Sequence, residues 1–288
     1  MMGIAVALVG AILAGIVTTG SRSQRFVGIS IAAALLAVAA WPPVSYVALT
    51  IAAIVALRVV DLAAERLSKS PVRRVLHIFT PFDSRIAAPC RPHLNAVRLL
   101  EALAWTALSY VAFKAAALSP ESTVFAHYAI RWSFGVLFVV ALFETIALSL
   151  SVIAAMVGFE IPLLHDAPYK ARSLREFWSV RWNKLVGHWL REHCYLPLAR
   201  RGYDSLALAA SFTASALIHL YIASVLLDVR WGLVMATLFL LQVPLLWIED
   251  VLNIRRRPTL IGRIWTLSVL FLLSPLFTEP VLRIFGSP

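Results

Sequence analysis

The chain has 288 residues, of which 60% are hydrophobic and only 14% charged, and its mean hydropathy is +0.83. Soluble domains carry about 45–50% apolar and about 25% charged residues, so the composition excludes a soluble protein and also a disordered chain. The net charge of +11 does not favour nucleic-acid binding, because the basic residues lie between long apolar runs and form no basic domain. The cysteines Cys90 and Cys194 form no CxxC pair and cannot build a disulfide framework.

Apolar runs long enough to cross a membrane recur along the chain, since a spanning helix needs about 20 mostly apolar residues. We predict an all-α, polytopic integral membrane protein: one membrane domain over residues 1–288, with eight transmembrane helices plus interfacial or re-entrant helices. The predicted spans are 3–19, 26–41, 44–60, 99–118, 132–158, 206–227, 230–249 and 263–283. The first has no basic residue before its apolar run, unlike a cleaved signal peptide. Residues 26–60 have an alternative interpretation as one kinked hairpin.

The charges of the loops predict which side of the membrane each loop faces. Most of the 26 lysines and arginines lie in the segments 20–25, 61–98, 160–205 and 250–262. The outer side holds only Arg131, Arg230 and Arg283, the last two at the outer ends of predicted spans. Cytoplasmic loops of membrane proteins carry an excess of positive charge. We therefore expect these four segments in the cytoplasm and both termini outside it. The excess of arginine over lysine and the frequent alanines indicate a bacterial genome, and hence a bacterial inner membrane.

The segment 160–205 contains an amphipathic stretch. Its apolar residues follow one helical stripe, at i, i+4, i+7 and i+11: Trp178, Trp182, Leu185 and Trp189. Ser173 precedes this stretch, with Glu176 three residues later, which is a capping-box pattern. The pattern predicts one helix over about 174–199. Because basic residues flank the stripe, its simplest interpretation is a helix that lies on the membrane surface.

Short motifs in and after this stretch occur in a specific order. Ser173-Leu174, Phe177-Trp178 and Arg181-Trp182-Asn183 are followed by Leu190-Arg191, by Tyr195-Leu196-Pro197 and, 36 residues after Asn183, by His219 in Ser215-Ala216-Leu217-Ile218-His219. Residues 167–220 resemble the signature region of the wax-synthase-like branch of the membrane-bound O-acyltransferases, in which these pairs recur and the histidine follows Ser-Gly-Leu-x. The chain departs from that pattern at Ser179 and Ala216, where glycine is common, and at Leu220.

The resemblance implies transfer of an acyl group from acyl-CoA to the hydroxyl of a lipophilic alcohol, giving an ester of the wax, sterol or terpenoid type. It implies His219 as the general base. Asn183 would donate a hydrogen bond to the thioester carbonyl as that carbonyl becomes an oxyanion, or would orient the acyl donor. The expected partners are acyl-CoA as co-substrate, the alcohol and membrane lipids, with no nucleic acid, no metal and no other cofactor. The residues expected to bind acyl-CoA are Trp178, Arg181, Trp182, Ser215, Arg175 and Lys184.

Other interpretations of the histidine remain open from the sequence. Ser211, Ser215 and His219 recur every fourth residue and form a polar stripe on the predicted sixth span. Such stripes also make ordinary hydrogen bonds between helices. The alternatives to an enzyme are a transporter or flippase that uses this stripe and Glu144 as a polar path, and a non-catalytic membrane subunit. A transporter would favour inverted repeats, and none is visible in the sequence.

The two predicted catalytic residues differ in expected depth. His219 is expected about 20 Å from the inner surface, at 1.5 Å per helical residue, whereas the segment of Asn183 is expected at that surface. Irregular backbone is tolerated inside a membrane where protein surrounds it. Either the segment 160–205 enters the helix bundle, or the sixth helix begins deeper than predicted.

Overall fold

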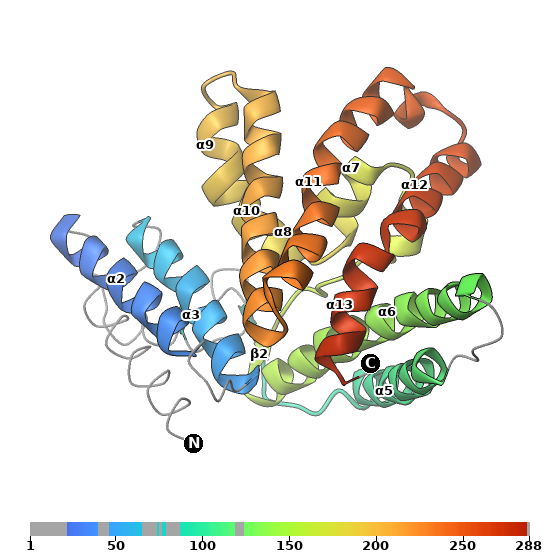
Figure 1. Cartoon of the computed structure of the whole chain (residues 1–288). Helices are drawn as coiled ribbons and strands as arrows, with labels where there is room; N and C mark the ends of the chain where they lie inside the picture. Colours follow the sequence, from blue (N-terminus) through green and yellow to red (C-terminus); the bar gives the residue numbers. More distant parts are fainter. Residues whose placement is uncertain are drawn as a thin grey trace. The chain divides into compact units, whose positions relative to one another are not determined.

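The computed structural model describes residues 22–39, 46–64, 74, 77–78, 87–118 and 124–286. Contacts divide the chain into two compact units, residues 1–87 and residues 88–288. The described parts of both units are helical, apart from one pair of very short strands (Figure 1). The single membrane domain over 1–288 stays a prediction, and the predicted span 3–19 lies outside the described residues.

The first unit contains α2 (Arg22–Ala39) and α3 (Tyr46–Ala63), which pack against each other. They correspond to the predicted spans 26–41 and 44–60. Arg58 is buried within α3, where its Nη1 atom lies 3.2 Å from Oδ2 of Asp61, one turn further on. Nε2 of His77 lies 3.2 Å from the same oxygen. The positive charge of Arg58, which lies inside an apolar run, is therefore compensated by the Asp61 carboxylate of the same unit.

The second unit contains the remaining described helices. The long helices are α5 (Ala96–Ala117), α6 (Val124–Met156), α10 (Asp204–Leu226), α11 (Val229–Val251), α12 (Thr259–Leu273) and α13 (Pro275–Ile284). The short helices are η1 (Pro168–Lys170), α7 (Leu174–Glu176), η2 (Phe177–Arg181), α8 (Lys184–Leu190), η3 (Arg191–Tyr195), α9 (Leu196–Ala199) and η4 (Ile254–Arg256). The antiparallel strands β1 (Ala88–Pro89) and β2 (Phe159–Glu160) join the chain before α5 to the chain after α6.

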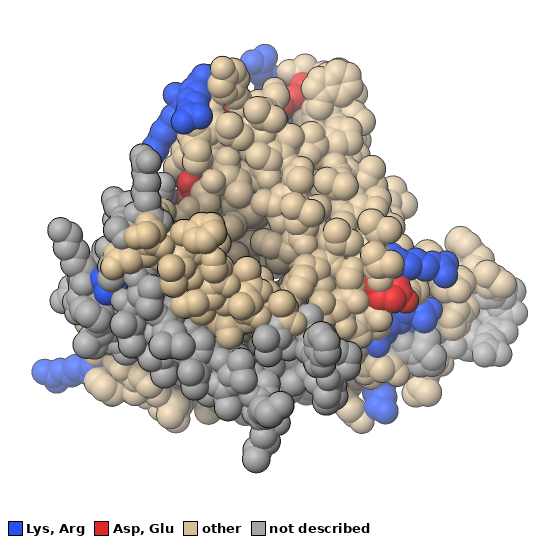
Figure 2. All heavy atoms as spheres, turned by 60° about the vertical axis from the view of Figure 1, so that its left-hand side comes forward, with Lys and Arg blue, Asp and Glu red and all other residues tan. Residues whose placement is uncertain are grey.

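The second unit has the helices that a polytopic membrane protein needs. Within the described residues, α5, α6, α10 and α11 are long and apolar enough to cross a membrane, and α12 with α13, bent by 47°, makes up to a fifth span. The all-α membrane fold is thus confirmed, whereas the count of eight spans is not. Large apolar side chains on outward faces are exposed, with Phe125 at 85% and Leu272 at 76%. Figure 2 shows, on one face, broad uncharged areas between small groups of charged side chains.

Small residues let these helices approach closely. Ala112 and Ala116 of α5 are fully buried, and α5 packs along α6. A Cβ atom added at Gly232 of α11 would lie 2.7 Å from the backbone oxygen of Leu220 in α10. Close approach through small residues is the usual way in which helices associate inside a membrane, where apolar side chains gain little by leaving lipid.

Helices α6 and α13 are joined by a buried ion pair. Arg131 is 3% exposed, and its Nε and Nη2 atoms lie 2.9 and 3.1 Å from the two carboxylate oxygens of Glu279. Arg283 donates to the same carboxylate from the next turn of α13, at 2.9 Å. The predicted span 132–158 began too late, since α6 starts at Val124. Arg131 therefore lies inside the helix and not in a loop, because Glu279 compensates its charge.

We expect Glu279→Gln to destabilise the protein strongly. Arg131 would then be a buried cation without its carboxylate, and breaking a buried pair on one side costs about 3–5 kcal/mol. The measurement is unfolding of the purified protein in mixed micelles by increasing amounts of a denaturing detergent. Arg283→Gln is the matched control, because its side chain is partly exposed and its loss should cost about 1 kcal/mol or less. Equal losses in the two variants would contradict this assignment.

Candidate functional site

The segment that carries the sequence motifs is a series of short helical pieces. The prediction of one helix over 174–199 is wrong: η2 has π-helical geometry, Trp182 is extended (φ −102°, ψ 131°) and Asn183 is left-handed (φ 39°, ψ 62°) before α8 begins. The predicted cap is confirmed, since Oγ of Ser173 accepts the N–H of Glu176 at 2.9 Å. Trp178 and Trp182 therefore do not share one helical stripe. The sequence did not reveal the break, because a break of two residues leaves the apolar periodicity almost unchanged.

The segment is attached to α11 through a buried carboxylate. Glu249 is fully buried, and its two oxygens accept the backbone N–H groups of Leu174 at 2.5 Å and Arg175 at 3.3 Å. The first N–H groups of a helix have no partner within the helix, and a negative charge at this end is favourable. Glu249 therefore holds the beginning of α7 inside the bundle.

Trp178 carries the segment deeper between the spans. Its Nε1 atom donates to Oε1 of Gln242 at 2.9 Å, and Gln242 is fully buried in α11. The Trp178 ring contacts Phe212 of α10 at 6.1 Å and Phe239 of α11 at 5.9 Å between centroids. Of the two alternatives for the different depths of Asn183 and His219, these contacts favour the first: the segment enters the helix bundle.

His219 lies where three helices of the bundle meet. Its ring stacks on Phe239 of α11, with centroids 4.0 Å apart, and contacts Phe277 of α13 at 5.7 Å. Its Nδ1 atom lies 2.7 Å from the backbone oxygen of Ser215. A carbonyl only accepts, so Nδ1 of the neutral ring carries the hydrogen and Nε2 keeps its lone pair. Within the described part of the chain, no side chain or backbone group bonds to Nε2.

Asn183 shapes the turn between η2 and α8. Its Oδ1 atom accepts the N–H of Val186 at 3.3 Å, and its backbone oxygen accepts the N–H of Gly187 at 2.9 Å. Asparagine is among the few residues that adopt left-handed backbone readily. The side-chain carbonyl is thus occupied as the cap of α8, and the Nδ2 amide is the group left for chemistry.

Two series of ring contacts connect the segment that carries the sequence motifs, residues 173–199 (the motif segment), to His219. Trp178 and His219 both contact Phe239. Trp182, the residue before Asn183, contacts Phe143 at 5.5 Å, and Phe143 contacts Phe277 at 6.4 Å. Phe277 is the second ring beside His219. The two motifs recognised in the sequence are therefore brought to one aromatic cluster, although they lie on different helices.

The three cations expected to bind acyl-CoA, Arg175, Arg181 and Lys184, already have acidic partners. Arg181 places Nε and Nη2 2.7 Å from Oε1 of Glu176, and its Nη1 donates to the backbone oxygen of Asp166 at 2.9 Å. Burial alone would raise the pKa of Glu176, but the backbone N–H of Arg172 and the Arg181 guanidinium hold that pKa below its usual value. Arg175 pairs with Asp250 at 2.9 Å, and Lys184 makes the longest pair, 3.8 Å to Asp166.

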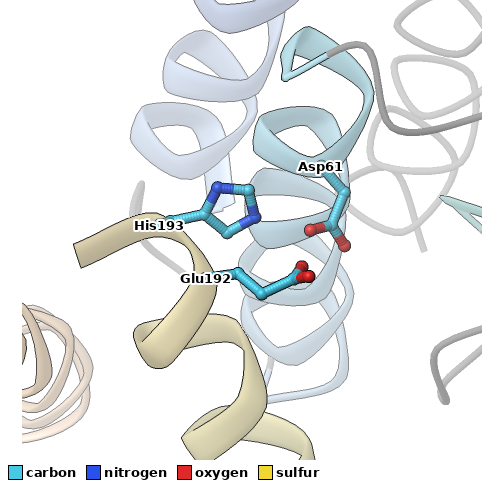
Figure 3. A group of neighbouring side chains, drawn as sticks. All are labelled: Asp61, Glu192 and His193. Atoms are coloured by element: carbon cyan, nitrogen blue, oxygen red, sulfur yellow. The ribbon is translucent and has the colours of Figure 1, made fainter. Parts of the chain in front are cut away.

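Two further histidines belong to a different part of the segment. Glu192 and His193 are neighbours in η3 (Figure 3). His188 lies one turn before Glu192, and its Nε2 atom is 3.6 Å from the Glu192 carboxylate. The His193 ring contacts Trp189 at 4.9 Å. His188 and His193 therefore serve as matched controls for His219.

The sequence motifs did not identify all the residues that build this site. Glu249 and Gln242 hold the segment, and Phe239 and Phe277 surround the imidazole. An acidic and an amide residue on the last turns of an apolar span were a usable signal, since polar groups there normally face protein. The two phenylalanines carry no such signal, because they look like any other apolar residue of a span.

Fold and site together define a polytopic helical membrane protein with an irregular segment beside a histidine-bearing span. Residues 161–242 match the model of the Membrane bound O-acyl transferase family. The chain is 34% identical over 77 residues to an Arabidopsis thaliana protein named "Probable long-chain-alcohol O-fatty-acyltransferase 1", which is 24% of this chain and 23% of that protein. It is 34% identical over 91 residues to "Probable long-chain-alcohol O-fatty-acyltransferase 2" from the same plant, 30% of this chain and 26% of that protein.

These similarities confirm the resemblance to the wax-synthase-like branch of the membrane-bound O-acyltransferases. The matched segment contains Asn183 and His219 and also the aromatic and amide residues Trp178, Phe239 and Gln242. It is less than a third of the chain, and the chain spans about a quarter of the length of these relatives. An integral membrane protein is supported by the similarity to this membrane-bound family and by the apolar helices. The bacterial inner membrane and the orientation of the termini stay predictions.

We expect Glu249→Ala to loosen the motif segment. Losing hydrogen bonds to a charged acceptor costs about 1.5–3 kcal/mol, which corresponds to about a tenfold or larger rise in local opening. The measurement is the rate of trypsin cleavage after Arg175 and Arg181 in detergent-solubilised protein. Asp250→Ala is the control, because Asp250 pairs with Arg175 near the surface. Equal cleavage in the Glu249→Ala and parent proteins would contradict the anchoring role.

Proposed function

We propose that the protein is an O-acyltransferase that transfers an acyl group from acyl-CoA to the hydroxyl of a lipophilic alcohol. The observation that supports this most is the geometry of His219, whose Nε2 lone pair has no partner in the described part of the chain. The names of the two plant relatives support a long-chain alcohol as the first acceptor to test. Sterols and terpenoid alcohols are the next acceptors.

In the proposed reaction, His219 acts as general base. Nε2 accepts the proton of the alcohol hydroxyl as the hydroxyl oxygen attacks the thioester carbon. The carbon–sulfur bond then breaks, and the departing CoA thiolate takes that proton from the His219 imidazolium, which restores the base. The hydrogen bond to the Ser215 backbone oxygen keeps the ring hydrogen on Nδ1 and leaves Nε2 as the acceptor. Phe239 and Phe277 exclude water around the ring, which limits hydrolysis of the thioester as a side reaction.

Asn183 is proposed to donate its Nδ2–H to the carbonyl oxygen as negative charge develops there. For the donor, we propose that the CoA phosphates meet Lys184 and Arg175 on the cytoplasmic side. Lys184 has the longer ion pair and the more exposed side chain of the two. Arg181 is the poorest candidate of the three cations, since Glu176 and the Asp166 backbone occupy its guanidinium.

Replacement of His219 by alanine should abolish most of the activity without unfolding the protein. Loss of a general base costs about 10²–10⁴-fold in rate, whereas the ring makes only one hydrogen bond, to its own helix. The measurement is radiolabelled ester formed from palmitoyl-CoA and hexadecanol by membranes that contain equal amounts of each variant. His188→Ala and His193→Ala should keep normal rates. A folded His219→Ala protein with normal turnover would move the transporter interpretation ahead.

The two roles of Asn183 can be separated by a pair of substitutions. Asn183→Asp keeps the oxygen that caps α8 and tolerates the left-handed turn, but it removes the amide donor. Asn183→Gly keeps the turn and removes both groups. We expect both variants to lose about 10²–10³-fold in ester formation, the cost of one oxyanion donor. Activity retained by Asn183→Asp and lost by Asn183→Gly would show that Asn183 is only a helix cap.

A further inference from the structure

A short strap brackets the turn that contains Asn183. Residues 164–166 run beside this turn and bond to it on both sides: the N–H of Asp166 donates to the oxygen of Arg181 at 2.9 Å, and the N–H of Lys184 donates to the oxygen of Leu164 at 2.9 Å. The middle residue of the strap is His165, and its ring stacks on Trp182 with centroids 4.6 Å apart. The strap therefore bonds to the backbone on both sides of the pair Trp182-Asn183, and the His165 ring packs on the Trp182 ring.

Trp182 is fixed by rings from three elements. Besides His165, it stacks with Phe177 of η2 at 5.6 Å and an interplanar angle of 13°, and it contacts the edge of Phe143 in α6 at 5.5 Å. Such aromatic pairs stabilise a packed arrangement beyond the burial of their area. Because Trp182 directly precedes Asn183, fixing its ring restricts how the left-handed residue presents its amide.

The His165 ring lies beside a carboxylate from the middle of a span. Its side chain is 2% exposed, and Nδ1 lies 3.3 Å from Oε1 of Glu144 in α6, a close contact that does not have hydrogen-bond geometry. A carboxylate inside a membrane span is costly and normally has a partner and a role. At this distance the carboxylate interacts electrostatically with the imidazole and favours orientations in which a ring N–H faces it. Glu144, which the sequence left without an assigned role, thus faces the strap.

We propose that Glu144 and His165 are positioning residues for acyl transfer. The carboxylate orients the imidazole, the imidazole holds Trp182, and Trp182 with the strap fixes the direction of the Asn183 amide. This proposal rests on the proposed function, since it acts through the oxyanion donor. Neither residue is placed at the reacting atoms: the shortest series of ring contacts from His165 to His219 passes through Phe143 and Phe277.

The test compares kcat and KM for palmitoyl-CoA and hexadecanol in His165→Ala, Glu144→Leu and Glu144→Gln, with His188→Ala as a matched histidine control. Misplacing a catalytic group by about 1 Å costs up to about 100-fold, so His165→Ala and Glu144→Leu should lower kcat about 10- to 100-fold. Both KM values should change little, because no substrate contact is removed. Glu144→Gln keeps an oxygen beside Nδ1 and should restore most of kcat.

A second arm asks whether the effect passes through Asn183. In the Asn183→Asp protein, which has no amide to position, His165→Ala should cost nothing further, because coupled residues are not additive. An equal further loss there, or a kcat per folded molecule that stays normal in both His165→Ala and Glu144→Leu, overturns this proposal alone. A parent protein that forms no ester overturns the proposed function, and this proposal with it. If His165→Ala does not accumulate in membranes, the two Glu144 variants carry the same comparison.

Discussion

The site depends on the buried Glu249 carboxylate, which accepts the first backbone N–H groups of the motif segment. A chain that enters a membrane bundle without a regular helix exposes peptide groups that water cannot reach, and each unsatisfied group costs several kcal/mol. Here the missing partners come from Glu249, from the Ser173 hydroxyl and from the strap 164–166. Because these partners exist, the segment can break its helix at Trp182 and still lie among the spans. The irregular turn at Asn183 follows from that compensation.

The same turn shows how Asn183 can combine its structural role with the chemical role that we propose for it. The left-handed backbone of Asn183 is costly for most residues and persists only where its surroundings determine it. This backbone is held by the two strap hydrogen bonds, by the stacked Trp182 ring and by the hydrogen bond that caps α8. An amide held by so many contacts needs little rearrangement to meet a developing charge, which is the condition for effective electrostatic stabilisation.

The sequence predicted the features that follow from composition and local periodicity. The spans that became α5, α10 and α11 were found because length and hydropathy suffice, and the cap at Ser173 was found because it is local. Sequence could not place Arg131, since its inclusion in α6 depends on Glu279, which lies on another helix. The break at Trp182 and the pairing of Glu144 with His165 were missed for the same reason. Each depends on a partner that the fold brings from far along the chain, and such partners leave no periodic trace.

The pattern of compensation also distinguishes His219 from the other polar groups of the second unit. Arg131 and Glu249 are buried, and each has charged or backbone partners that satisfy it. Within the described residues, His219 has such a partner at Nδ1 alone, and its ring is bordered by Phe239 and Phe277. A histidine that joined two helices would direct a ring nitrogen to its neighbour, whereas Nδ1 of His219 bonds within α10. An imidazole with one nitrogen fixed and the other left open has the arrangement that the proposed general base requires, because Nε2 can receive the proton of a substrate hydroxyl.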